Sequence, residues 1–127
     1  MAIRICLLVS DDLDDHQLVS EALASISENT VVLNIIDSQK ALLLLQQPQY
    51  QPHYLMLDLS MHGIKVNSIL KVVRDRANTI RRPVVLYGTV EAFLQIENKG
   101  DLLFFDKDYD YSDLKAALEK MIGGAMQ

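Results

Sequence analysis

The chain lacks several features that mark specialised protein classes. It has a single cysteine, Cys6, so no disulfide can form within its 127 residues. Cys6 lies inside an apolar run, which favours a small buried core residue over a nucleophile or a ligand. No apolar run approaches the length of a membrane span, and the N-terminus lacks the cleavage pattern of a signal peptide. We therefore expect a cytoplasmic protein that does not enter a membrane.

Excess positive charge is also lacking. The formal net charge is −5, whereas surfaces that bind nucleic acid are normally basic, so we expect no nucleic-acid partner. The sequence contains no internal repeat, no low-complexity stretch and no linker toward a second domain. Its 127 residues are the length of one typical domain, and 50% of them are hydrophobic. We therefore expect a single domain over residues 1–127 with no output domain.

Short apolar runs alternate with segments of helical periodicity along the chain. Strands are expected at residues 3–9, 31–36, 54–58, 84–87 and 102–105, and helices from the SDDLDD stretch to residue 26 and at 38–45, 64–76, 90–98 and 112–122. Ser38 is the expected N-cap of the second helix. This alternation predicts an α/β fold in which a parallel sheet is covered on both faces and joined by right-handed crossovers.

Polar and charged residues follow four of the five predicted strands. They are Ser10, Asp11 and Asp12 after the first strand, Asp58 at the end of the third, Gly88 and Thr89 after the fourth, and Asp106, Lys107 and Asp108 after the fifth. Ligands of open parallel sheets bind at the carboxyl ends of the strands. Carboxylates gathered there repel one another unless protons or a cation neutralise them, and Mg²⁺ takes oxygen ligands.

The chemistry of such a site centres on Asp58. An aspartate beside a cation and the Lys107 ammonium can act as a nucleophile toward phosphorus. Each residue also has a plainer explanation when it is taken singly. The acids can cap the helices that follow them, and Lys107 can simply balance their charge. The sequence favours a shared site because all these residues fall at one edge of the predicted sheet.

Four pieces of the chain resemble the receiver domain of bacterial two-component response regulators. They are ICLLVSDDLDD, HYLMLDLSMHG, RRPVVLYGTV and LLFFDKDY, which end the first, third, fourth and fifth strands in that order. The resemblance covers nearly the whole chain and resides more in order and spacing than in any one piece. It implies a stand-alone receiver with a doubly wound, flavodoxin-like (βα)5 three-layer sandwich and strand order 2-1-3-4-5.

The resemblance also implies a phosphoacceptor site. Asp58 would accept a phosphoryl group from a histidine of a sensor kinase or phosphotransfer protein. The implied Mg²⁺ ligands are Asp11, Asp58 and the backbone carbonyl of Ser60, with Asp12 as a further candidate. Mg²⁺ is the one implied cofactor. The phosphorylated protein would then signal by binding a downstream protein, and the resemblance leaves pairing of two copies open.

Two residues near the last strands also match family positions. Lys107 would contact the phosphoryl oxygens, and Phe104 stands where an aromatic switch residue changes rotamer. For Phe104, a plain core phenylalanine is an equally good interpretation. Asp108 departs from the family pattern, since it replaces the proline that usually follows the lysine.

Two further departures bear on function. Ser10 stands where the first of two adjacent acids belongs, and Gly88 stands where the family has Thr or Ser. Thr89 comes one residue later, and one step along a regular strand turns a side chain to the opposite face. Thr89 can therefore contact a phosphoryl group only if the loop bulges, which Gly88 would permit.

These departures leave two functions to weigh. The first is a phosphoacceptor that signals through protein contacts and is no enzyme beyond slow self-dephosphorylation. The second is a pseudo-receiver that keeps the fold and docks partners without phosphorylation. An aspartyl-phosphate hydrolase is disfavoured because Ser60 stands where such enzymes have a second Asp. A flavodoxin-like cofactor binder is disfavoured because SDDLDD would repel a phosphate.

Overall fold

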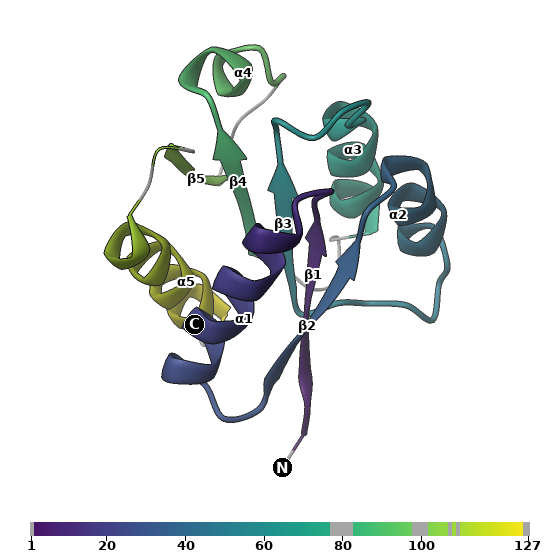
Figure 1. Cartoon of the computed structure of the whole chain (residues 1–127). Helices are drawn as coiled ribbons and strands as arrows, with labels where there is room; N and C mark the ends of the chain where they lie inside the picture. Colours follow the sequence, from purple (N-terminus) through teal and green to yellow (C-terminus); the bar gives the residue numbers. More distant parts are fainter. Residues whose placement is uncertain (1, 77–82, 98–101, 107, 109, 126–127) are drawn as a thin grey trace.

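Five parallel strands form one sheet with helices on both faces in the computed structural model of the chain (Figure 1). The structure describes residues 2–76, 83–97, 102–106, 108 and 110–125. The strands are β1 Arg4–Val9, β2 Thr30–Ile35, β3 Tyr54–Asp58, β4 Val84–Gly88 and β5 Leu103–Asp106. The helices are α1 Leu13–Ile26, α2 Ser38–Leu45, α3 Val66–Arg76, α4 Val90–Leu94 and α5 Tyr111–Ala125. The sheet order β2-β1-β3-β4-β5 confirms the predicted α/β class and topology.

The element boundaries differ from prediction where a local hydrogen bond decides them. Ser38 was the expected cap of α2, and this prediction was wrong. The side chain of Asp37 caps the helix instead, because it accepts from the backbone N–H groups of Gln39 and Lys40. The Ser38 hydroxyl is buried and accepts from Lys65 N at 2.8 Å, so it ties the start of α2 to the loop before α3. The fourth helix is shorter than predicted and ends at Leu94.

Alternation along the strands divides the core into two layers. Cys6 and Leu8 point to the face covered by α1 and α5, whereas Leu7 and Val9 point to the opposite face, which α2 and α3 cover (Figure 1). Such strands are buried on both sides, which explains their continuous apolar runs. No helix in the described ranges is long and apolar enough to cross a membrane.

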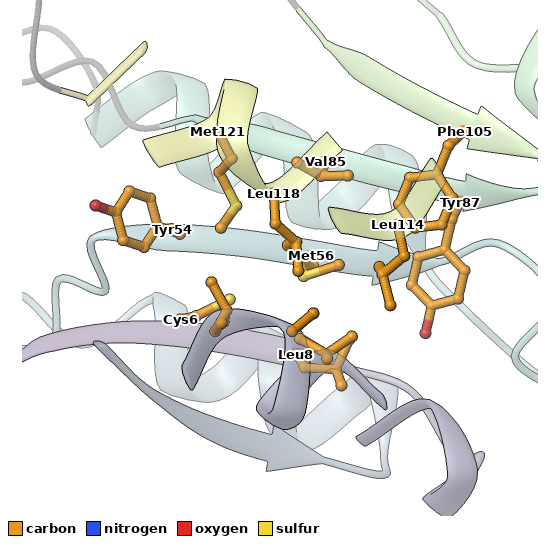
Figure 2. Packing of buried hydrophobic residues seen from close by; sticks show 13 residues of the cluster. Cys6, Leu8, Tyr54, Met56, Val85, Tyr87, Phe105, Leu114, Leu118 and Met121 are labelled. Atoms are coloured by element: carbon orange, nitrogen blue, oxygen red, sulfur yellow. The ribbon is translucent and has the colours of Figure 1, made fainter. Parts of the chain in front are cut away.

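The first of these layers bears directly on the candidate site. It is built from β1, β3, β4 and β5 side chains packed on Leu23 of α1 and on Leu114, Leu118 and Met121 of α5. In Figure 2, Tyr87 lies at one end of this layer beside Leu114 and Phe105, with its hydroxyl pointing out of the apolar cluster. Tyr54 lies at the other end. The layer therefore has a polar boundary near the carboxyl ends of the strands.

Candidate functional site

Asp58 is the last residue of β3 and is 1% exposed. It pairs in register with Tyr87 of β4, which pairs in turn with Phe105 of β5. Residues paired in a parallel sheet share a face, so the Asp58 carboxylate points to the side of the sheet that α1 and α5 cover. A carboxylate buried to this degree must be hydrogen-bonded or neutralised, since burial of an isolated charge is very costly.

Within the described part of the chain, two hydrogen bonds hold the Asp58 carboxylate. Its Oδ1 accepts from the backbone N–H of Ser60 at 2.8 Å, which closes a tight turn directly after the strand. Its Oδ2 accepts from the hydroxyl of Ser10 at 2.9 Å, across 48 residues of sequence. Both of these donors are neutral, so they hydrogen-bond the carboxylate without themselves cancelling its charge.

A second carboxylate adjoins the first. Asp15, on the first turn of α1, is 6% exposed, and its Oδ2 lies 3.3 Å from the Ser10 hydroxyl. The same Oδ2 accepts from the hydroxyl of Tyr87 at 2.9 Å. Burial raises the pKa of Tyr87 well above its usual value, and the nearby Asp58 and Asp15 carboxylates raise it further. Tyr87 therefore keeps its proton and acts as a permanent donor to Asp15.

Sequence reasoning missed Asp15 and Tyr87. A signal for Asp15 was present, because it lies four residues before Val19 and so shares the buried helix face that Val19 and Leu23 form. An acid on that face must find a buried donor. For Tyr87 the alternation of β4 gave the face but not the partner, since Asp15 lies 72 positions away in the sequence.

The other acids at the end of β1 have separate roles. Asp11 is exposed, and its role as a metal ligand stays a prediction. Asp12 is the N-cap of α1, because its Oδ1 accepts from Asp14 N at 2.9 Å. The backbone N–H of Asp12 donates to Ser10 Oγ at 3.1 Å, which fixes the Ser10 side chain against the turn. The role of Asp12 at a metal stays a prediction.

The donor set fits Mg²⁺ in chemical type. Asp11 and Asp58 supply carboxylate oxygens and Ser60 supplies a backbone carbonyl, and Mg²⁺ often binds one or two carboxylates together with waters. Ser10 supplies a hydroxyl in place of a third negative charge. Among the residues that the structure describes, no three His, Cys, Asp or Glu side chains gather as a metal cluster. A cation here would therefore need the carbonyl and waters to complete its coordination.

The end of β4 is shaped by a close approach to Leu59, the residue that follows β3. Gly88 has φ of 156°, and a Cβ built on it would lie 2.7 Å from Cβ of Leu59. Leu59 thus occupies the space that a side chain at position 88 would need. Thr89 is exposed and caps α4, with its hydroxyl accepting from Ala92 N at 3.1 Å. The predicted contact of Thr89 with a phosphoryl group stays a prediction.

The fifth strand carries the remaining predicted residues. Phe104 is half-buried on the α3 side of the sheet and stacks on Phe93 of α4 at 4.4 Å between ring centroids. Its role as a switch residue stays a prediction. Asp106 is exposed and accepts from Asp108 N at 3.0 Å. Lys107 lies outside the described residues.

Comparison with solved structures identifies the fold as that of response regulator receivers. The chemotaxis response regulator CheY4 of Vibrio cholerae superposes with a TM-score of 0.73 at 20% identity, covering 94% of this chain and 99% of its own. The phosphorylated cyanobacterial phytochrome response regulator RcpA gives 0.71 at 20% identity, covering 99% of this chain and 96% of its own.

A third structure shows what such a cleft holds in another protein. The receiver domain of sensor histidine kinase PA1611 from Pseudomonas aeruginosa has a magnesium ion coordinated in its active site cleft. It gives a TM-score of 0.68 at 19% identity, covering 96% of this chain and 99% of its own. No family model and no curated protein sequence matches the chain. The comparisons thus establish the receiver fold.

Proposed function

We propose that the chain is a stand-alone response regulator receiver that accepts a phosphoryl group on Asp58 and signals by binding another protein. The observation that carries this proposal is the Asp58 carboxylate itself. It ends β3 at the carboxyl edge of a receiver-type sheet, and Ser60 N and Ser10 Oγ hold it in one orientation. A fixed carboxylate at this edge stands where doubly wound folds bind phosphorylated ligands.

In the proposed reaction an Asp58 oxygen forms a bond to phosphorus while the bond from phosphorus to the histidine nitrogen of the donor protein breaks. The electron pair of the broken bond stays on that nitrogen, so the partner regains its free imidazole. The Ser60 N–H and Ser10 O–H hold the carboxylate plane during the attack. Asp11, Asp58 and the Ser60 carbonyl would hold Mg²⁺, which offsets the charge gathered on the phosphoryl oxygens when it is bound.

The proposed partners follow from this chemistry. The donor is a sensor histidine kinase or a histidine phosphotransfer protein, and the recipient of the signal is a second protein. In this proposal the chain is a signalling protein and not an enzyme, beyond slow loss of its own phosphoryl group. Its place is the cytoplasm, where such donors present their phosphohistidine.

The direct test uses a small phosphodonor and Mg²⁺ with the full chain. We expect intact-mass spectrometry to show the addition of one phosphoryl group to the wild type and none to Asp58→Asn. Asp15→Asn is the matched control, because it removes the other buried carboxylate of the same network. Equal labelling of the Asp58→Asn variant, or no labelling of the wild type, would rule the proposal out.

A pseudo-receiver is the second candidate, and two observations favour it. Asp58 is 1% exposed, so a donor must displace its cover before attack, and Ser10 removes one negative charge from the metal site. This candidate predicts that partner binding is identical for the wild type and Asp58→Asn. It also predicts no binding of beryllofluoride, which mimics a phosphoryl group on a carboxylate.

A further inference from the structure

The Ser10 hydroxyl has one proton and two carboxylates within reach. Its Oγ lies 2.9 Å from Asp58 Oδ2 and 3.3 Å from Asp15 Oδ2. A hydroxyl donates to one acceptor at a time, and the shorter contact marks Asp58 as the present acceptor. Any change that weakens Asp58 as an acceptor therefore turns this proton toward Asp15.

Asp15 in turn holds Tyr87. The Tyr87 hydroxyl donates to the same Asp15 oxygen that faces Ser10, so the two donors compete for one atom. A stronger bond from Ser10 weakens the bond from Tyr87, because each oxygen offers limited lone-pair density. The orientation of Tyr87 thus depends on how Ser10 divides its proton between Asp58 and Asp15.

Tyr87 connects this polar cluster to the apolar core. Its ring stacks on Phe105 with centroids 5.2 Å apart and planes 6° from parallel. Both rings belong to the layer that includes Leu114 and Leu118 of α5, as Figure 2 shows. Close-packed interiors transmit small displacements, so a turn of the Tyr87 ring reaches α5.

We propose that Ser10, Asp15 and Tyr87 form a relay that carries the chemical state of Asp58 to the face formed by α1 and α5. The relay deepens the proposed function, on which its biological use rests. Phosphorylation converts the Asp58 carboxylate to an acyl phosphate, so the negative charge comes to lie on the phosphoryl oxygens and the remaining carboxyl oxygen becomes a weaker acceptor for Ser10. The Ser10 hydroxyl then rotates and donates to Asp15 instead of Asp58. The hydrogen bond from Tyr87 to Asp15 weakens, and the Tyr87 ring changes how Phe105 packs against α5. Asp15 and Tyr87 are positioning residues in this scheme, since neither makes a bond to phosphorus.

The structure of β4 favours this route over one through a hydroxyl at the strand end. Gly88 has no side chain, and Leu59 fills the space beside it. The Thr89 hydroxyl already accepts from Ala92 N at the start of α4. Tyr87, one residue earlier and on the α5 side, is linked to Asp58 through Asp15 and Ser10, by contacts of 2.9, 3.3 and 2.9 Å in that order.

The test compares backbone amide chemical shifts in the wild type and in Tyr87→Phe. The perturbation is Asp58→Asn, which removes the charge of Asp58 without any added ligand. We expect it to shift amides next to position 58, at Leu59 and Ser60, and amides of α5 at Leu114 and Leu118. In the Tyr87→Phe background the first set should still shift, whereas the α5 shifts should fall by at least about twofold.

Tyr54→Phe is the matched control. Tyr54 belongs to the same apolar layer but lies at its far end, where its hydroxyl accepts from Arg4 Nη1 at 3.0 Å. Loss of this hydroxyl should leave the α5 response to Asp58→Asn unchanged. A second variant, Asp15→Asn, should reduce the α5 response as Tyr87→Phe does, and it answers the question if Tyr87→Phe does not fold.

The outcomes separate the relay from the proposed function. An α5 response of full size in both Tyr87→Phe and Asp15→Asn overturns the relay, as does an equal loss in Tyr54→Phe. A parallel titration of the wild type with Mg²⁺ and beryllofluoride tests the phosphoacceptor alone. Absence of shifts at Leu59 and Ser60 in that titration rejects the proposed function, while the Asp58→Asn comparison still decides the relay.

Discussion

Buried tyrosine hydroxyls in this protein differ in whether they have a partner. Tyr87 and Tyr54 each use their hydroxyl, in bonds to Asp15 and Arg4 respectively. The Tyr50 hydroxyl is buried and has no hydrogen-bond partner among the residues that the structure describes, and burial raises the pKa of Tyr50. A buried polar group without a partner costs free energy, so Tyr50 is a site where the native sequence is not at its stability optimum.

Tyr50→Phe should therefore stabilise the protein. We expect the free energy of unfolding to rise by about 1 kcal/mol, because the variant removes an unpaired hydroxyl and keeps the ring. Urea unfolding followed by circular dichroism measures the change. Tyr54→Phe provides the comparison, since it loses a real hydrogen bond and should gain nothing. A loss of stability in Tyr50→Phe would show that its hydroxyl has a partner in solution.

The neutral Ser10 side chain limits the buried cluster to two carboxylates, Asp15 and Asp58. Ser10→Asp should lower the free energy of unfolding by about 2 kcal/mol in metal-free buffer, because a third carboxylate then faces Asp15 and Asp58. Addition of Mg²⁺ should recover much of this loss, since a cation neutralises the cluster.

The matched control for this change is Ser10→Asn, which has similar size and no charge. Mg²⁺ should stabilise this variant less than it stabilises Ser10→Asp, because the proposed ligands Asp11, Asp58 and Ser60 remain but no added charge has to be neutralised. Thermal unfolding with and without Mg²⁺ gives both comparisons. If Mg²⁺ stabilised neither variant or both equally, Ser10 would not be adjacent to a cation site.

Among the elements, the junction of β4 and α4 departs most from what the resemblance implied. The contact of Gly88 with Leu59 and the cap formed by Thr89 together define how the strand ends. The chain cannot regain a side chain at position 88 without moving Leu59, the residue that follows β3. The departure from Thr or Ser at this position is therefore compensated by packing and is more than the loss of one hydroxyl.

Gly88→Thr should consequently fail to restore a hydroxyl at the site and should destabilise the protein by about 2–3 kcal/mol. The comparison is Gly63→Ala, where φ is 71° but no atom lies within 4 Å of the added Cβ, so backbone strain alone should cost about 1 kcal/mol. Chemical denaturation of both variants measures the difference. Equal costs would mean that Leu59 moves aside freely.

At the scale of the whole molecule, the two-sided burial of β1 makes Cys6 a reporter of global unfolding. Its side chain is 0% exposed, and burial raises the pKa of the thiol to about 12. Native alkylation near neutral pH should be at least about a thousand-fold slower than in urea, because the thiolate is scarce and covered. The labelling rate should follow the urea unfolding curve. Fast labelling in native buffer would indicate local opening of β1.

The alternation of strands and helices, and the set of polar residues at the strand ends, could be predicted from the sequence alone. Periodicity and turn chemistry are local properties, so the described elements appear within a few residues of their predicted positions. The order of the strands came from the resemblance, and the sheet confirms it. The acids at the ends of β1, β3 and β5 could likewise be identified directly in the sequence.

Tertiary structure alone decided which of these groups meet. Ser10 reaches Asp58 across 48 residues and Tyr87 reaches Asp15 across 72, and no local pattern encodes such pairings. The same holds for Gly88, whose neighbour Leu59 lies in the turn directly after β3. Local propensity acts within a few residues, whereas a hydrogen bond between distant segments exists only after the sheet has set their register. The sequence therefore determined the parts of the candidate site, and the packing of α1 and β4 against β3 determined how they are connected.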